Sequence, residues 1–228
     1  MSDLVIVDND VALKISCYSL VDEFFATTRS GASSTSMLGV GKYVIRNRVD
    51  RTSKIVDRDR ARRAVEYLLS SISLIEPSDS ELEAAAALEA KATMQGLELD
   101  SGESQLLAIM AHRGHELLIT GDKRAIKAMA IVATEASSNR VACLEQLFGW
   151  MIAACTLDQI RGAVCKEPSV DQTITICFGC SQCSSVDFNV AEALSSYIRH
   201  LDGEAPGVLR HSTKYPKISD ATDTTAPG

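Results

Sequence analysis

Apolar residues follow two patterns along the first 135 residues, short continuous runs and positions at helical spacing. Residues 4–8 form a β-branched run, and the apolar residues of 11–25 recur at helical spacing, which predicts a strand followed by a helix. Residues 116–120 form a second apolar run, and a predicted helix follows from Lys123 to about Ala133. Strands that alternate with helices favour parallel pairing. The pattern therefore predicts a three-layer α/β/α fold with a central, mainly parallel sheet.

Further elements follow from the same spacing and from capping signals. Ser78 and Glu81 form a capping-box pattern before an alanine-rich helix that Gly96 ends, and Gly114 ends the next helix. Residues 26–36 are small and polar, as in a loop that flanks a short strand. We also predict helices over 59–71, 140–154 and 190–201, and a strand over 171–177.

These elements predict three parts of the chain. Residues 1–138 hold the alternating strands and helices, and 139–202 form a helical and β extension that packs on them. From Gly203 the chain is rich in Pro, Thr, Ser and Asp, so 203–228 is predicted to be a flexible tail.

Three acidic residues occupy positions where a folded sheet would gather them. Asp8 closes the first apolar run, Asp122 follows the second, and Glu103 lies in the first turn of a helix. Catalytic groups in parallel sheets collect beyond the carboxyl ends of the strands. Converging carboxylates repel each other unless a divalent cation lies between them, and Mg²⁺ or Mn²⁺ suits oxygen ligands. Such a site would support phosphodiester cleavage.

Each acid also has a purely structural interpretation. Asp100 and Glu103 form a capping-box pattern, and Asp122 is placed to cap the helix that begins at Lys123. Asp8 is the hardest to explain in this way. Asp10 and Asp100 are weaker candidates that fit turn or cap positions.

Three segments resemble the PIN-domain family of α/β/α ribonucleases, which includes toxins of bacterial toxin–antitoxin pairs. They are IVDNDVALKI, LDSGESQLLAIMA and LLITGDKRAIKAMA, and the resemblance covers residues 4–135. It implies metal-dependent endonucleolytic cleavage of RNA, with Asp8, Glu103 and Asp122 as metal ligands and Asn9 and Thr120 as supporting neighbours. Many members carry another acid after the second strand, but residues 36–49 hold none. Two alternatives follow: Asp100 substitutes for that acid, or the site holds only one metal tightly.

Charge is unevenly distributed in a chain whose net charge is −7. Residues 42–63 hold nine basic side chains against three acidic ones, whereas 76–103 hold eight acidic side chains and Lys91. A basic strip beside an acidic pocket suits an RNA substrate. The candidate RNA-binding residues are Arg46, Arg58, Arg62, Arg63 and Lys123.

Two other functions stay open. One is a catalytically weak RNA-binding module on the same fold. The other is a protein interface formed by residues 42–63 and the tail, for example with an inhibitory antitoxin whose arginine reaches the acidic pocket. A homodimer is common for the fold that the resemblance implies. The sequence contains no Walker motif, dinucleotide fingerprint or serine-hydrolase elbow.

Seven cysteines, an odd number spread through the chain, favour reduced thiols and a cytosolic protein. Cys177, Cys180 and Cys183 are closely spaced, and Cys165 would supply a fourth ligand for a structural zinc. Buried thiols are the favoured alternative, and an iron–sulfur cluster is a third. No apolar run reaches the ~18 residues of a membrane helix, which predicts a cytoplasmic location.

Overall fold

The computed structural model describes residues 5–29, 34–182 and 188–211. The described strands are β1 (Val5–Val7), β2 (Thr35–Leu38), β3 (Ser73–Ile75), β4 (Leu117–Thr120) and β5 (Val141–Cys143). The described helices are α1 (Asn9–Tyr18), α2 (Val21–Thr28), α3 (Gly41–Arg51), α4 (Arg58–Ser71), α5 (Asp79–Met94), α6 (Ser101–Arg113), α7 (Lys123–Val132), α8 (Thr134–Ser137), α9 (Leu144–Ala154), α10 (Leu157–Lys166), α11 (Gln172–Cys177), the 3₁₀ turn η1 (Cys180–Gln182) and α12 (Val190–Glu204).

The five strands form one sheet, in the order β3-β2-β1-β4-β5, with every pair parallel. The chain moves from β1 outward to β3, then returns across β1 to β4 and continues to β5. Strand order therefore reverses between β1 and β4, where a parallel sheet opens a crevice at the carboxyl ends of its strands. Val7 is in register with Ile119, and the Asp8 amide donates to the Ile119 carbonyl over 2.9 Å.

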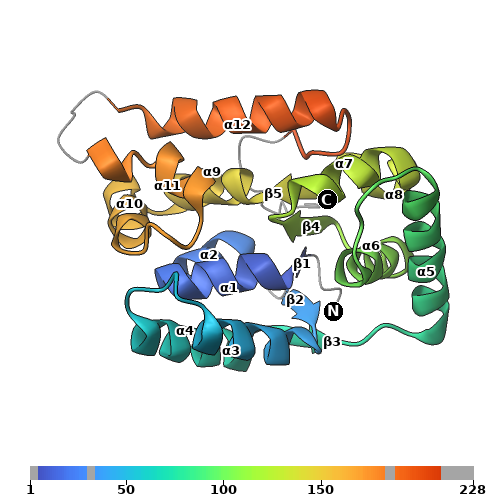
Figure 1. The fold of residues 1–228 in the computed structure, drawn as a ribbon, viewed down its shortest axis with the longest axis horizontal. Helices are drawn as coiled ribbons and strands as arrows, with labels where there is room; N and C mark the ends of the chain where they lie inside the picture. Colours follow the sequence, from blue (N-terminus) through green and yellow to red (C-terminus); the bar gives the residue numbers. More distant parts are fainter. Residues whose placement is uncertain (1–4, 30–33, 183–187, 212–228) are drawn as a thin grey trace, which may run out of the picture.

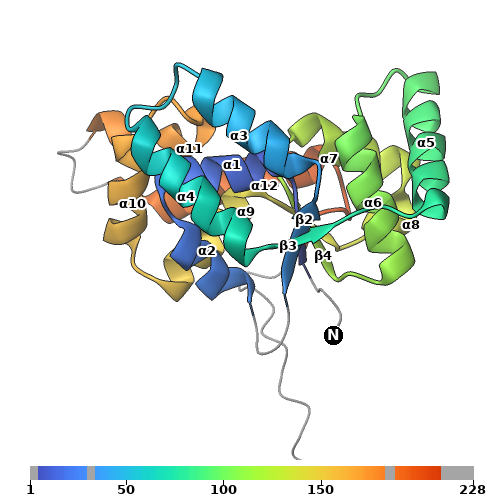
Figure 2. The same ribbon diagram turned by 90° about the horizontal axis from the view of Figure 1, so that it is seen from below.

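Helices cover both faces of the sheet and make the predicted three-layer α/β/α fold. Figure 2 shows α5 and α6 on one side of the sheet, and α1, α4 and α10 on the other. The apolar side chains form two corresponding cores, one that includes Phe24, Phe148 and Phe178, and one that includes Leu106 and Met129. Helix α12 lies along α9 and extends toward α7 (Figure 1), so it contributes to both cores.

Local signals set the ends of several helices as the sequence predicts. Ser78 and Glu81 form a reciprocal capping box at the start of α5, and Gly114 ends α6 in the left-handed conformation, at φ 69°. The predicted helix over 11–25 is instead divided into α1 and α2, because Ser19 adopts a left-handed conformation that ends α1.

The predicted strand over 171–177 is wrong, because this segment forms α11. The Asp171 side chain accepts a hydrogen bond from the Ile174 amide over 3.0 Å and caps the helix. Ile174 and Cys177, three residues apart, are both fully buried, whereas Ile176 is 58% exposed. A strand would place Ile174 and Ile176 on the same face, whereas a helix places Ile174 and Cys177 together on its buried face.

The segment after Asn139 also differs from its prediction as a helix. Residues 141–143 form β5, which pairs with β4 at the edge of the sheet, and α9 begins only at Leu144. The sheet thus continues beyond residue 138, where we placed the domain boundary. Tertiary pairing decided this element, since three residues carry too little pattern to distinguish strand from helix.

The first residues of the predicted flexible tail belong instead to the folded structure. Ala205, Val208 and Leu209 are at most 1% exposed, and Leu209 bridges to Val141 beside β5. The Arg210 amide donates to the Val141 carbonyl over 2.8 Å. Residues 212–228 lie outside the described residues.

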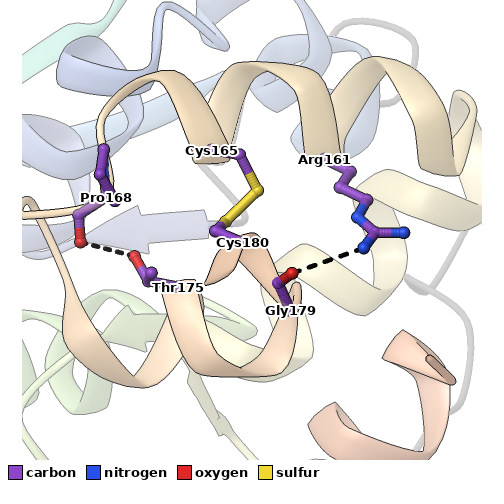
Figure 3. Close-up of a disulfide and its surroundings, with 6 residues drawn as sticks. All are labelled: Arg161, Cys165, Pro168, Thr175, Gly179 and Cys180. Atoms are coloured by element: carbon purple, nitrogen blue, oxygen red, sulfur yellow. Dashed lines mark hydrogen bonds between the residues drawn. A yellow bond between two sulfur atoms is a disulfide. The ribbon is translucent and has the colours of Figure 1, made fainter. Parts of the chain in front are cut away.

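A disulfide joins Cys165 of α10 to Cys180 of η1 (Figure 3). In the same segment, which runs from α10 to η1, Thr175 donates to the Pro168 carbonyl over 2.7 Å. The prediction of reduced thiols is therefore wrong for this pair. The bond also uses two of the four candidate zinc ligands; Cys177 is a buried free thiol, and Cys183 lies outside the described residues.

Across the described residues we find no helix that combines the length and the apolar character needed to span a membrane.

Candidate functional site

An acidic cavity of about 570 Å³ lies at the carboxyl ends of β1 and β4, where the strand order reverses. Asp8 directly follows β1, Asp122 lies two residues after β4, and Glu103 is in the first turn of α6. All three line this cavity, together with Asn9, Asp10 and Asp100. The fold therefore brings together the acidic residues that the sequence singled out.

Asp8 is the acid that local structure does not explain. It precedes α1, yet its side chain makes no capping hydrogen bond, and the residue is only 9% exposed. Burial, followed by the charges of Asp10 and Asp100, raises the pKa of Asp8 to about 6, and the neighbouring backbone amides offset part of this rise. A buried carboxylate whose pKa is raised by burial and by neighbouring acids is typical of a functional group.

Glu103 and Asp100 hold each other at the start of α6. The Glu103 amide donates to Asp100 Oδ1 over 2.9 Å, and the Asp100 amide donates to Glu103 Oε2 over 3.1 Å. Burial raises the pKa of Glu103 to about 8, with further contributions from the charges of Asp100, Asp122 and Asp8. The capping box is thus real, and it fixes Glu103 in a crowded acidic environment.

Asp122 also caps a helix while it lines the cavity. Its Oδ1 accepts hydrogen bonds from the amides of Arg124 and Ala125 over 2.8 and 3.3 Å, and the Arg124 guanidinium lies 3.2 Å from Oδ2. Burial acts to raise the pKa of Asp122, but these hydrogen bonds outweigh it and lower the pKa. The buried Thr120 accepts from the Asp122 amide over 3.1 Å and thereby supports the turn.

Asp10 differs from Asp8 because cations compensate its charge. Lys14, one helical turn later, lies 2.6 Å from Asp10 and 2.8 Å from Asp171, and Arg48 lies 3.4 Å from Asp10. Burial acts to lower the pKa of Lys14, but the two carboxylates outweigh it and raise the pKa. Asp10 therefore holds the side chains of Lys14 and Arg48 at the wall of the cavity.

Asn9 contributes a polar group whose hydrogen-bonding capacity is unused. Its Oδ1 atom is buried and has no hydrogen-bond partner among the residues that the structure describes. A Cβ at Gly41 would lie 1.9 Å from this oxygen, so glycine at the start of α3 leaves room for the Asn9 amide. Asn9 is one of the residues that line the acidic cavity.

The structure separates the predicted RNA-binding residues into two groups. Lys123 lines the acidic cavity and lies 2.7 Å from the buried Glu145. The other four, Arg46, Arg58, Arg62 and Arg63, are exposed and do not line this cavity. Arg46 donates to Glu66 over 2.7 Å, and Arg62 donates to Asp50 over 2.8 Å.

The cations that do reach the cavity are Lys14, Arg48, Lys123 and Arg124. The spacing of Asp10 and Lys14 on one helix was a signal for Lys14 in the sequence. Nothing in the sequence indicated Asp171, which follows Lys14 by more than 150 positions. Only the packing of the α10–α11 loop against α1 brings this carboxylate to the cavity.

Within residues 5–29, 34–182 and 188–211, no three His, Cys, Asp or Glu side chains already stand in metal-binding geometry. Burial raises the pKa of Asp8 and Glu103 most, and the neighbouring carboxylates raise it further; a bound cation relieves this second contribution.

Comparisons of the chain with known protein families, with curated proteins and with solved structures find no match. Functional inference therefore rests on the chemistry of the cavity and on the way the fold builds it.

Proposed function

We propose that this protein is a divalent-metal-dependent endoribonuclease with a PIN-like fold. The observation that supports this most strongly is the convergence of Asp8, Glu103 and Asp122 in one cavity at the reversal of strand order. Parallel α/β sheets place their ligands at this position. The short motifs around the three acids are the same ones on which the resemblance to PIN-domain ribonucleases rests.

The donor chemistry of the cavity fits Mg²⁺ or Mn²⁺. Asp8, Glu103 and Asp122 would hold the ion through carboxylate oxygens, and the unpartnered Asn9 Oδ1 adds a neutral oxygen nearby. A bound ion would polarise the scissile phosphate and lower the pKa of a water molecule. No zinc or iron–sulfur centre enters this proposal.

The remaining residues of the cavity would position the substrate and the ligands. Asp100 fixes Glu103 through the capping box, and Thr120 supports the turn that carries Asp122. Lys14, Arg48 and Lys123 place positive charge beside the acids, where it can bind the phosphates of an RNA strand and stabilise charge that develops during cleavage. Glu103 must lose its proton before it binds a cation, because its pKa is raised.

A direct test is the cleavage of labelled single-stranded RNA by the purified full-length chain. We expect cleavage with Mn²⁺ and none with EDTA. Asp8→Asn should lower the rate more than ~100-fold, since even outer partners of metal ligands contribute 10–100-fold. Asp158→Asn, an exposed acid on α10, is the matched control and should retain the native rate. An Asp8→Asn variant with full activity would refute the role of Asp8.

A second candidate is a catalytically weak RNA-binding module on the same fold. Helix α3 presents Val44 and Arg48 to the cavity. In this region many members of the PIN-domain family carry another acid. Fewer carboxylates would hold a cation less tightly. This candidate predicts salt-sensitive RNA binding without product at any Mn²⁺ concentration, and metal-dependent product would exclude it.

A further inference from the structure

A second cavity, of about 710 Å³, adjoins the acidic one. It lies between α1, the second half of α3 with its following loop, and the start of α11. Lys14, Arg48, Asp171 and Thr173 are among the residues that line both cavities. The two cavities therefore share a wall, and a ligand that is longer than one of them can extend into the other.

The second cavity carries an excess of positive charge. Lys14 and Arg48 are partly neutralised by Asp10 and Asp171. Arg51 and Lys54 add two exposed cations, and neither forms an ion pair within the part of the chain that the structure describes. Unpaired cations that line a cavity are available to an anionic ligand.

The loop that carries Lys54 is fixed by a buried carboxylate from the C-terminal half of the chain. Glu167 is fully buried and accepts hydrogen bonds from the amides of Val56 and Asp57 over 2.6 and 2.9 Å. It also accepts from Arg60 over 3.0 Å. The segment from Glu167 to Thr173 therefore holds this loop in place. It also supplies Asp171 and Thr173 to the wall of the second cavity, where it packs against α1.

Helix α3 connects the two cavities along its length. Val44 lines the acidic cavity, Arg48 lines both, and Asn47 and Arg51 line the second one. Val44 and Arg51 are about 10 Å apart along a helix that rises 1.5 Å per residue. At ~3.4 Å per nucleotide, this length matches roughly three nucleotides of a stacked strand.

We propose that the second cavity binds the backbone phosphates of a single RNA strand two or three nucleotides away from the phosphate in the acidic cavity. This inference rests on the proposed function, because it takes the acidic cavity as the place of cleavage. Arg51 and Lys54 make the phosphate contacts. The exposed arginines of α4 do not, although the sequence pointed to them.

The test measures binding apart from cleavage. Fluorescence anisotropy of a labelled 12-nucleotide single-stranded RNA is recorded with the full-length chain in EDTA, over a series of salt concentrations. We expect Arg51→Gln/Lys54→Gln to weaken binding at least tenfold and to reduce the salt slope by about 1.4, as for two lost phosphate contacts on a single strand. Lys166→Gln/Arg199→Gln removes two exposed cations that line neither cavity and should change binding less than twofold.

Three outcomes would overturn the inference. They are native affinity in the Arg51/Lys54 variant, an equal loss in the control variant, and a native chain that binds polyglutamate as tightly as RNA. The result is separable from the proposed function. If the Arg51/Lys54 variant binds RNA with native affinity while Mn²⁺-dependent cleavage is native, only the proposed role of the second cavity is refuted. If binding weakens as expected but no cleavage is seen, only the proposed nuclease activity is refuted.

Discussion

Glu167 offers the sharpest test of how the two halves of the chain are held together. Its carboxylate is fully buried and accepts from two backbone amides and from Arg60. Replacement by glutamine keeps the size of the side chain but leaves one acceptor oxygen. One amide of the loop then faces an NH₂ group that can only donate.

The expected loss of stability follows from these contacts. A hydrogen bond to a charged group contributes about 1.5–3 kcal/mol, and a buried donor without a partner costs about 1–3 kcal/mol. The Arg60 side chain is 27% exposed, so solvent partly screens its ion pair with Glu167. These effects overlap, and we expect Glu167→Gln to lower the free energy of unfolding by about 2–4 kcal/mol, a large share of the 5–15 kcal/mol that is typical of folded proteins.

Urea denaturation followed by far-UV circular dichroism measures this change. With a slope of about 3 kcal/mol per molar urea, the midpoint should fall by about 1 M. Glu66→Gln is the matched control, because Glu66 pairs with Arg46 on the surface, and its midpoint should stay at the native value. The RNA-binding assay described above should show weaker binding for Glu167→Gln, because the loop that carries Lys54 is released.

The reasoning would be refuted if Glu167→Gln unfolded at the native urea concentration. A midpoint that falls equally for Glu66→Gln would also contradict it, since burial would then have no part in the effect. A double-mutant cycle with Arg60→Gln separates the ion pair from the amide contacts.

Two further predictions concern the acidic cavity and the disulfide. The pKa of Glu103 is raised from 4.5 to about 8 in the folded chain, so the folded state binds this proton more tightly than the unfolded state. The stability it contributes is complete below pH 4.5 and is lost as the pH rises through 8. The melting temperature in EDTA should therefore fall between pH 5.5 and 8.5 by more in the native chain than in Glu103→Gln, and an equal fall would contradict the assignment. Cys165 and Cys180 are 15 residues apart, and a disulfide that closes such a loop contributes about 3 kcal/mol. Reduction should lower the urea midpoint of the native chain but not of Cys165→Ser/Cys180→Ser, and a native midpoint insensitive to reductant would exclude a stabilising bond.

Local sequence was sufficient for the elements that carry strong signals of their own. The apolar runs at 4–8 and 116–120 predicted β1 and β4, and the Ser78–Glu81 capping box and Gly114 predicted the limits of their helices. Asp8, Glu103 and Asp122 could be selected because their places relative to strand and helix ends are local properties. The order of strands and helices also predicted the three layers.

Elements with weak local signals were decided by their neighbours. Strands β3 and β5 have three residues each, and such segments become strands only when an adjacent strand supplies hydrogen bonds. Residues 171–177 alternate like a strand but fold as α11, because the helix buries Ile174 with Cys177 and receives a cap from Asp171. The disulfide likewise depends on the packing of α10 beside η1.

The sequence by itself determined which acids could form a site and on which kind of element each one lies. The tertiary structure decided which other charged groups face them. It placed Lys14, Arg48 and the carboxylate of Asp171 at the cavities and left Arg46 and Arg62 on the surface, paired with acids. The physical reason is that capping and periodicity act over a few residues, whereas the Lys14–Asp171 pair and the Glu167 contacts join positions more than 100 residues apart. Such contacts exist only after the sheet and its two helical layers have formed.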